Sequence, residues 1–370
     1  MTATLSTTST DFSAQCAQDV ASALVKRQPA RMTFWGFRLS TGALLPRRPF
    51  GVDWGMPIQP HQLPMALRHA AFSSSEARAL GVSQRRLRAA DLCSPFHGAR
   101  LQDSPPALGD IASRARAFAP LMSKRHAFTH VTALRLHQID LPQSQRYNHD
   151  LHVMVVDAAH RIRRPGVRCL VVAPRGRIVQ VQGLRVTDPA TTFLHLARTL
   201  DLEDLIDVGD AMTRRKSPAT SLEELRRAVA AAGGLKGVPR ARAALEHIIE
   251  GTDSVPETRL RRLIESAGFA RPTVNQRMFD GATYLGRPDL SYPALKISIE
   301  YLGDGHRTQR SVWEIDIDRS ADFRSAGWTV LEVTAQTLIN PAAFLRRLRA
   351  AGAPARTAGP SAQRRSPQAS

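Results

Sequence analysis

Two acidic residues near the C-terminus have the spacing of metal ligands on neighbouring strands. Asp289 stands in a Pro-Asp pair, and Glu300 follows 11 residues later. The segment from Leu295 to Tyr301 alternates apolar and polar side chains, which predicts a strand that carries Glu300 on its polar face. Such a pair of carboxylates suits Mg²⁺ or Mn²⁺, because hard cations take oxygen ligands and keep waters for attack on a phosphate. The alternative is an exposed strand end with two solvated acids.

Three further residues with chemical potential follow this pair. His306 lies six residues after Glu300, where a neutral imidazole could serve as a general base or acid. Asp316 and Arg319 share one face of a helix expected over 311–325. They either form an ordinary surface ion pair or border the site, with Arg319 near a phosphate.

Glu257 belongs to the helix that we expect to open this region. Ser254 and Glu257 match a capping box, and the helix should continue to about Ala267 before Gly268 ends it. Glu257 lies three residues before Leu260 of the apolar stripe, so its carboxylate should point inward. It therefore either caps the helix only or reaches into the metal site.

The elements that must position these side chains follow in a regular order. A hairpin at Asp280-Gly281 should join two strands, and the residues of 328–333 are the β-formers expected of a central buried strand. The predicted elements after the first helix are strands 274–279, 284–290 and 295–301, helix 311–325, strand 328–333 and helix 341–350.

This order, together with GRPDLSYPALKISIEYLGDGHR and IDIDRSADFRSAGWTVLEV, resembles the PD-(D/E)xK nuclease superfamily. More closely, it resembles the endonuclease-like domain related to very-short-patch mismatch-repair endonucleases, over roughly residues 254–350. The resemblance implies a restriction-endonuclease-like αβββαβ-type domain, with metal ligands Asp289 and Glu300 for Mg²⁺ or Mn²⁺. It also implies catalytic roles for Glu257, Asp289, Glu300, His306 and Asp316. The sequence departs from the superfamily at Leu302, which replaces a lysine, so His306 or Lys296 would have to substitute.

The middle of the chain favours contact with DNA. Residues 67–250 carry 28 Lys and Arg against 17 Asp and Glu, a net +11 of the total +19, as a polyanion-binding segment would. High arginine usage throughout the chain is the alternative. Ser73 or Ser74 should cap a short helix that ends at Gly81, and Ser83 should cap a second helix through Ala90. A helix-turn-helix of this kind would present a set of polar side chains to the major groove, or merely to solvent: Gln84, Arg85, Arg86 and Arg88.

This middle region resembles the AbiEi-like antitoxins of type IV toxin–antitoxin systems. The motifs that carry the resemblance are SSEARALGVSQRRLRAADLCSPFHGAR, THVTALRLHQIDLP, GLRVTDPATTFLHLA and DLEDLIDVGDAM. It implies a winged-helix-like head, a mixed α/β body and a possible toxin partner. Periodicity predicts a helix ending at Leu136, strands 151–156, 167–172 and 178–182, and helices 189–200, 202–213, 222–231 and 239–250.

The whole chain should therefore be a mixed α/β protein in four parts. These are a poorly ordered extension (1–66), a DNA-binding region (67–250), an endonuclease-like domain (251–350) and a disordered basic tail (351–370). No apolar run approaches 18 residues, which argues against a membrane span, and the N-terminus lacks a secretory signal pattern. The three cysteines lie far apart and form no CxxC pair, which argues against a zinc ribbon and a disulfide scaffold, so we expect the reducing cytoplasm as the location. We expect a metal-dependent DNA endonuclease, and a non-enzymatic DNA-binding regulator with a degenerate nuclease fold is the alternative. The DNA sequence preference and the oligomeric state stay open.

Overall fold

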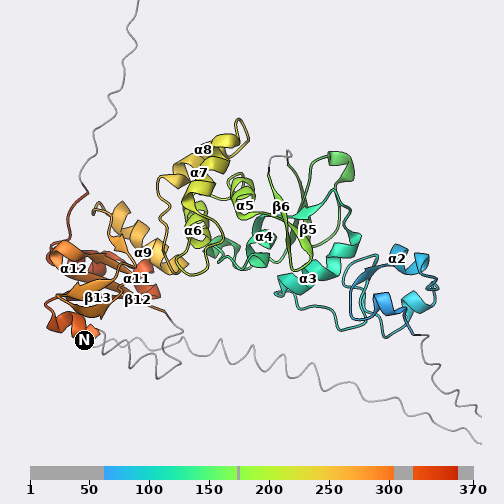
Figure 1. The fold of residues 1–370 in the computed structure, drawn as a ribbon, viewed down its shortest axis with the longest axis horizontal. Helices are drawn as coiled ribbons and strands as arrows, with labels where there is room; N and C mark the ends of the chain where they lie inside the picture. Colours follow the sequence, from blue (N-terminus) through green and yellow to red (C-terminus); the bar gives the residue numbers. More distant parts are fainter. Residues whose placement is uncertain (1–61, 173–175, 304–319, 357–370) are drawn as a thin grey trace, which may run out of the picture. The chain divides into compact units, whose positions relative to one another are not determined.

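The computed structural model describes residues 62–172, 176–303 and 320–356. The protein is a mixed α/β fold, as expected, with several separate sheets and helices (Figure 1). The expectations for 1–61 and for the end of the basic tail fall outside the described residues. Among the described helices, none has the length and apolar character needed to cross a membrane.

In the segment where a helix-turn-helix was expected, the structure has one α-helix. Helix α2 (Ser74–Ala79) begins with a capping box between Ser73 and Glu76. The prediction of a second helix is wrong. Arg86–Arg88 form only a single 3-10 turn, η2, in which Leu87 is buried and the Arg86 guanidinium binds the Asp91 carboxylate. Strands β1 (Phe72–Ser73) and β2 (Ala99–Arg100) pair antiparallel beside these turns.

The next region is a five-stranded sheet in the order β5-β4-β3-β7-β6. Its strands are β3 (Ala127–Phe128), β4 (Leu151–Val155), β5 (Val167–Val171), β6 (Ile178–Val181) and β7 (Leu184–Thr187). Strand β7 was not predicted, and it pairs antiparallel with β6 across Gln182 and Gly183. Both turn residues have positive φ (50° and 78°), as a tight hairpin turn requires. Helices α3 (Ile111–Phe118) and α4 (His130–Leu136) pack on this sheet around Phe118 and Phe128.

Four predicted helices follow and share one apolar core, which includes Phe193, Leu205 and Val229. They are α5 (Pro189–Leu196), α6 (Leu202–Met212), α7 (Leu222–Ala231) and α8 (Val238–Leu245). Asp188 caps α5, Asp201 caps α6 and Ser221 caps α7 through their side-chain oxygens. These local signals explain why the helix starts were predictable from the sequence.

The C-terminal region contains a four-stranded sheet in the order β13-β12-β11-β8. Strands β8 and β11 are antiparallel, as are β11 and β12, whereas β12 and β13 are parallel. The elements are α9 (Val255–Ser266), β8 (Thr273–Val274), β9 (Met278–Asp280), β10 (Thr283–Gly286), β11 (Leu290–Tyr292), β12 (Ile297–Leu302), β13 (Thr329–Thr334), α11 (Ala335–Ile339) and α12 (Ala342–Ala350). Residues 320–325 are also helical.

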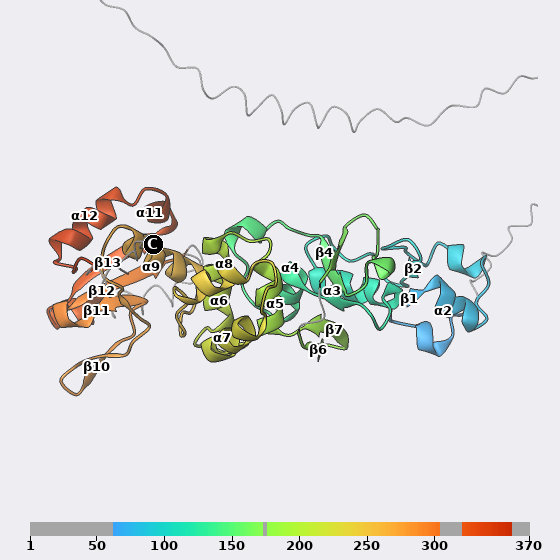
Figure 2. The same ribbon diagram turned by 90° about the horizontal axis from the view of Figure 1, so that it is seen from above.

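Two long predicted strands are each divided in the structure. Asn275 adopts a left-handed φ of 47° and lies between β8 and β9, and a segment that includes Pro288 lies between β10 and β11. Strands β9 and β10 therefore form the predicted hairpin at Asp280-Gly281, but as a separate ribbon. Figure 2 shows this hairpin extending away from β11, β12 and β13.

Side chains cover both faces of the four-stranded sheet. One face packs Ile299 and Leu331 against Leu260 of α9 and Phe344 of α12. On the other face Val330 packs with an apolar group that includes Phe323. Two expectations for this sheet were wrong. Strand β13 lies at an edge of the described sheet, because no described strand pairs with its outer side, and Leu295 is an exposed residue of a 3-10 turn before β12.

Candidate functional site

The sheet brings Asp289 and Glu300 to the same face. Strands β11 and β12 pair Leu290 with Ile299 and Ser291 with Ser298. This register, continued by one residue, sets Asp289 opposite Glu300. Directly opposite residues of an antiparallel pair point to one face, with Cβ atoms about 4.5–5.5 Å apart. The pairing of these strands is therefore compatible with the predicted proximity of the two carboxylates, and both residues line the same cavity.

Asp289 and Glu300 line one cavity of about 600 Å³, which we call the carboxylate cavity. Its other lining residues are Arg215, Lys216, Asp253, Asn275, Tyr284, Arg287, Tyr301 and Leu302. The Asp289 carboxylate accepts a hydrogen bond from the Tyr301 N–H at 2.7 Å, which orients it over the end of β12. Glu300 is only 6% exposed, so its carboxylate is withdrawn from bulk solvent.

Basic side chains from two distant parts of the chain line the carboxylate cavity. Arg287 comes from the segment before β11, whereas Arg215 and Lys216 follow α6. The Arg215 guanidinium forms an ion pair with Asp253. Carboxylates and cations thus face the same space, which is the combination required to hold a cation and a phosphate together. No sequence signal pointed to Arg215, Lys216 or Asp253.

Glu257 supports this cavity without lining it. Its Oε1 accepts a hydrogen bond from the Ser254 hydroxyl at 2.8 Å, and its Oε2 accepts from the Asp253 N–H at 3.0 Å and the Asn275 amide at 2.9 Å. The Asn275 N–H in turn donates to the Asp289 carbonyl at 3.0 Å. The inward orientation of Glu257 was predicted, and its contacts favour a cap and positioning role over that of a metal ligand.

The donor set of the carboxylate cavity fits a magnesium-type cation. Mg²⁺ is commonly held by one or two carboxylates and keeps several waters, so Asp289 and Glu300 supply a sufficient protein share. The described residues include no cluster of three or more His, Cys, Asp or Glu that could enclose a metal ion. A two-carboxylate magnesium site is compatible with the oxygens of Asp289 and Glu300.

An aromatic and basic patch lies on the hairpin beside the carboxylate cavity. The Arg277 guanidinium carbon lies 4.9 Å from the ring centroid of Tyr284 and 5.6 Å from that of Phe279. Both rings are about half exposed, at 49% and 50%. Since Tyr284 also lines the cavity, the hairpin offers stacking surfaces to a ligand that enters it.

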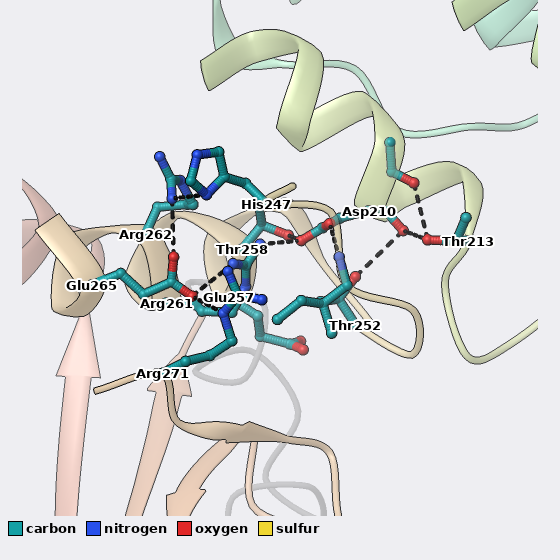
Figure 3. Close-up of polar contacts among 12 residues, drawn as sticks. Asp210, Thr213, His247, Thr252, Glu257, Thr258, Arg261, Arg262, Glu265 and Arg271 are labelled. Carbon is teal, nitrogen blue, oxygen red and sulfur yellow. Dashed lines mark hydrogen bonds and ion pairs between the residues drawn. The ribbon is translucent and has the colours of Figure 1, made fainter. Parts of the chain in front are cut away.

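A buried ion-pair network joins α9 to α6 (Figure 3). Arg261 and Asp210 are both fully buried, and they pair at 2.8 Å. Arg261 also pairs with Glu265 at 3.0 Å, and Thr258 donates to Asp210 at 2.9 Å. Burial raises the pKa of Asp210, although Arg261 opposes this shift. The network anchors the first helix of the C-terminal region to the helices that precede it.

None of the other predicted site residues that the structure describes lines the carboxylate cavity. His306, Asp316 and Arg319 lie outside the described residues. Lys296, the expected substitute for a missing lysine, precedes β12 and donates from Nζ to the Ala326 carbonyl at 2.9 Å. It does not line the cavity. Leu302, which stands where the superfamily has its lysine, does line the cavity.

The predicted DNA-reading residues of the first region differ in their exposure. Gln84, Arg85 and Arg88 are exposed on and beside η2. Arg86 is 9% exposed and binds Asp91 through two hydrogen bonds of 2.8 and 2.6 Å. A guanidinium engaged in this way supports the local fold, whereas the side chains of Gln84, Arg85 and Arg88 are open to solvent.

Comparisons with protein-family models, with curated proteins and with solved structures found no match for this chain.

Proposed function

We propose that this protein is a metal-dependent endonuclease that hydrolyses phosphodiester bonds in DNA. The observation that carries the proposal is that Asp289 and Glu300, next to the paired residues of β11 and β12, line one cavity that also contains basic side chains. The described elements run helix, three antiparallel strands, helix, strand, an order compatible with the resemblance to the PD-(D/E)xK superfamily. The hairpin β9–β10 interrupts this order as a separate ribbon.

The residues of the carboxylate cavity have distinct roles in this proposal. Asp289 and Glu300 hold the cation, which when bound supplies polarisation of the phosphate and activation of a water. The Tyr301 N–H and the Asn275 N–H orient Asp289 through its side chain and its carbonyl. Arg287 binds a phosphate oxygen. His306 is proposed as a general acid or base, a role that rests on the resemblance only.

The middle region would bring the nuclease to DNA. Its net charge of +11 and the exposed Gln84, Arg85 and Arg88 are compatible with phosphate and groove contacts. The resemblance to AbiEi-like antitoxins supports a toxin partner, and the sequence pattern supports a cytoplasmic location. A winged-helix-like head would have to present η2 in place of a second helix.

A non-enzymatic DNA-binding regulator is the second candidate function. It is favoured by Leu302, which places an apolar side chain in the cavity where the superfamily has a charged one. In that case the carboxylate cavity would be a remnant of a nuclease fold, and the chain would act through DNA binding alone.

The test is a cleavage assay with the full chain on supercoiled and linear DNA, with Mg²⁺, Mn²⁺ or EDTA. Asp289→Asn and Glu300→Gln remove one charge each while retaining side-chain shape, and each should reduce metal-dependent cleavage at least 100-fold, a loss of about 3 kcal/mol in transition-state stabilisation. DNA binding should be unchanged or slightly tighter, because a charge that repels phosphate is gone. Asp280→Asn, an exposed acid at the hairpin tip, is the matched control.

Two outcomes would contradict the endonuclease. If the wild-type chain cleaves no DNA with either metal but binds it, the regulator is favoured. If Asp289→Asn and Glu300→Gln cleave as fast as Asp280→Asn, the activity belongs to another site or to a contaminating nuclease.

A further inference from the structure

We propose that Lys216 supplies the catalytic cation that the sequence lacks at Leu302, by contacting the scissile phosphate in the carboxylate cavity. Lys216 belongs to the loop after α6, and it lines the same cavity as Asp289 and Glu300 although 73 residues separate it from Asp289. This inference rests on the proposed endonuclease function and extends it, because it makes the active site a composite of the middle and C-terminal regions.

Backbone contacts hold the loop of Lys216 against the start of the C-terminal region. The Gly251 N–H donates to the Thr213 carbonyl at 3.1 Å, and the Arg215 N–H donates to the Thr252 carbonyl at 3.1 Å. The Arg215 guanidinium adds an ion pair with Asp253, whose backbone N–H is bound by Glu257. Lys216 therefore follows a segment that is anchored on both its main chain and its side chain.

Lys216 is the lysine of the cavity that is available to a phosphate. Among the described residues, neither Lys216 nor Arg287 has an ion-pair or side-chain hydrogen-bond partner, whereas Arg215 is engaged by Asp253. Lys296 is engaged by a carbonyl outside the cavity. Two unpartnered cations that face two carboxylates form a site for an anion that also binds a metal, as a phosphodiester does.

The chemistry assigns charge stabilisation, not proton transfer, to Lys216. In the hydrolysis a water oxygen bonds to phosphorus, and the bond from phosphorus to one bridging oxygen breaks with its electron pair left on that oxygen. One proton of the water stays on the attacking oxygen, and the other ends on the leaving oxygen. An ammonium beside the non-bridging oxygens stabilises the negative charge that gathers there in the transition state.

The experiment compares Lys216→Met and Lys216→Arg in the full chain, on the DNA and metal that the wild type cleaves. Lys216→Met should lower kcat on the order of 10²-fold, the effect of removing one charge-stabilising donor, with KM for DNA changed by less than about threefold. Lys216→Arg should restore part of kcat, since it retains the positive charge. Lys236→Met, an exposed lysine between α7 and α8, controls for net charge and should leave kcat unchanged.

Each outcome decides the inference. If the wild type cleaves and Lys216→Met cleaves at the same kcat, Lys216 is not catalytic although the endonuclease stands. A rise in KM alone would reduce Lys216 to a DNA-binding residue and overturn the assignment. If the wild type cleaves nothing, the endonuclease and this inference fail together. Lys216 is exposed, so the thermal unfolding midpoint of each variant should match that of the wild type. If Lys216→Met lowers the midpoint, Lys216→Gln, which also removes the charge, replaces it, and an unchanged kcat in Lys216→Gln overturns the inference.

Discussion

Single buried side chains in this protein are sensitive to the loss of their partners, and Glu257 is the clearest case near the site. Glu257→Ala would leave the buried Asn275 amide and the Asp253 N–H without their acceptor. Each unsatisfied buried donor costs about 1–3 kcal/mol, so we expect a loss of roughly 2–5 kcal/mol in the free energy of unfolding. Chemical denaturation measures this loss. Glu257→Gln keeps an acceptor oxygen, and an equally large loss in that variant would contradict the explanation.

Asp207 on α6 makes stability depend on pH. Burial raises the pKa of Asp207 to about 7. The ion pair with Arg259 at 2.9 Å favours the charged carboxylate and offsets only part of this effect of burial. The folded state therefore binds the proton of this carboxyl group more tightly than the unfolded state, in which the pKa of an aspartate is about 3.9. Its contribution to stability is complete below about pH 4 and is lost as the pH rises through about 7.

Asp207→Asn should remove this part of the pH dependence. Between pH 4.5 and 7.5 the wild type should lose a few kcal/mol of stability relative to the variant, because each pKa unit corresponds to about 1.4 kcal/mol. Denaturant midpoints of both proteins across this range give the difference. Parallel curves for the two proteins would show that Asp207 titrates normally.

At the scale of elements, the contact between α6 and α9 depends on a charge pair without access to solvent. Arg261→Ala would leave Asp210 buried without its cation. Breaking a buried pair in this way costs about 3–5 kcal/mol, which should appear as a large fall in the denaturant midpoint. Arg227→Ala is the matched control, because Arg227 and its partner Glu223 on α7 are both exposed and their ion pair is screened by water. Equal losses in the two variants would show that burial of the pair does not matter.

At the scale of the whole molecule, the positive charge predicts salt-dependent binding to DNA. Each phosphate contact should contribute about −0.9 to the slope of log affinity against log salt concentration. Arg85→Ala combined with Arg88→Ala should reduce the slope by about 2 and weaken binding, as measured by fluorescence anisotropy between 50 and 200 mM salt. Arg86 is left intact, because its ion pair with Asp91 supports the fold.

The matched control for this experiment is Arg226→Ala with Arg227→Ala on α7, which removes the same net charge from another exposed surface. An equal change of slope in both double variants would attribute binding to net charge, and the region around η2 would then have no special role in DNA contact.

Much of the secondary structure was predictable from the sequence, because helix caps and side-chain periodicity are properties of short segments. Asp188 and Ser254 begin α5 and α9 as their caps indicated, and Asp280-Gly281 closes the predicted hairpin. Strand lengths were less predictable, since a single left-handed residue such as Asn275 ends a strand within an otherwise β-forming run. The same local reasoning led to Asp289 and Glu300, which are separated by only one turn.

Only the tertiary structure decided which side chains from distant parts of the sequence line the cavity of Asp289 and Glu300. Lys216 and Arg215 line their cavity only because the loop after α6 packs against the segment before α9. Likewise Arg86 is withdrawn by Asp91, and Arg261 is buried against Asp210 from another helix. The sequence determines local backbone preference through the period of its side chains. It does not reveal which segments meet, because that depends on long-range packing summed over the whole chain.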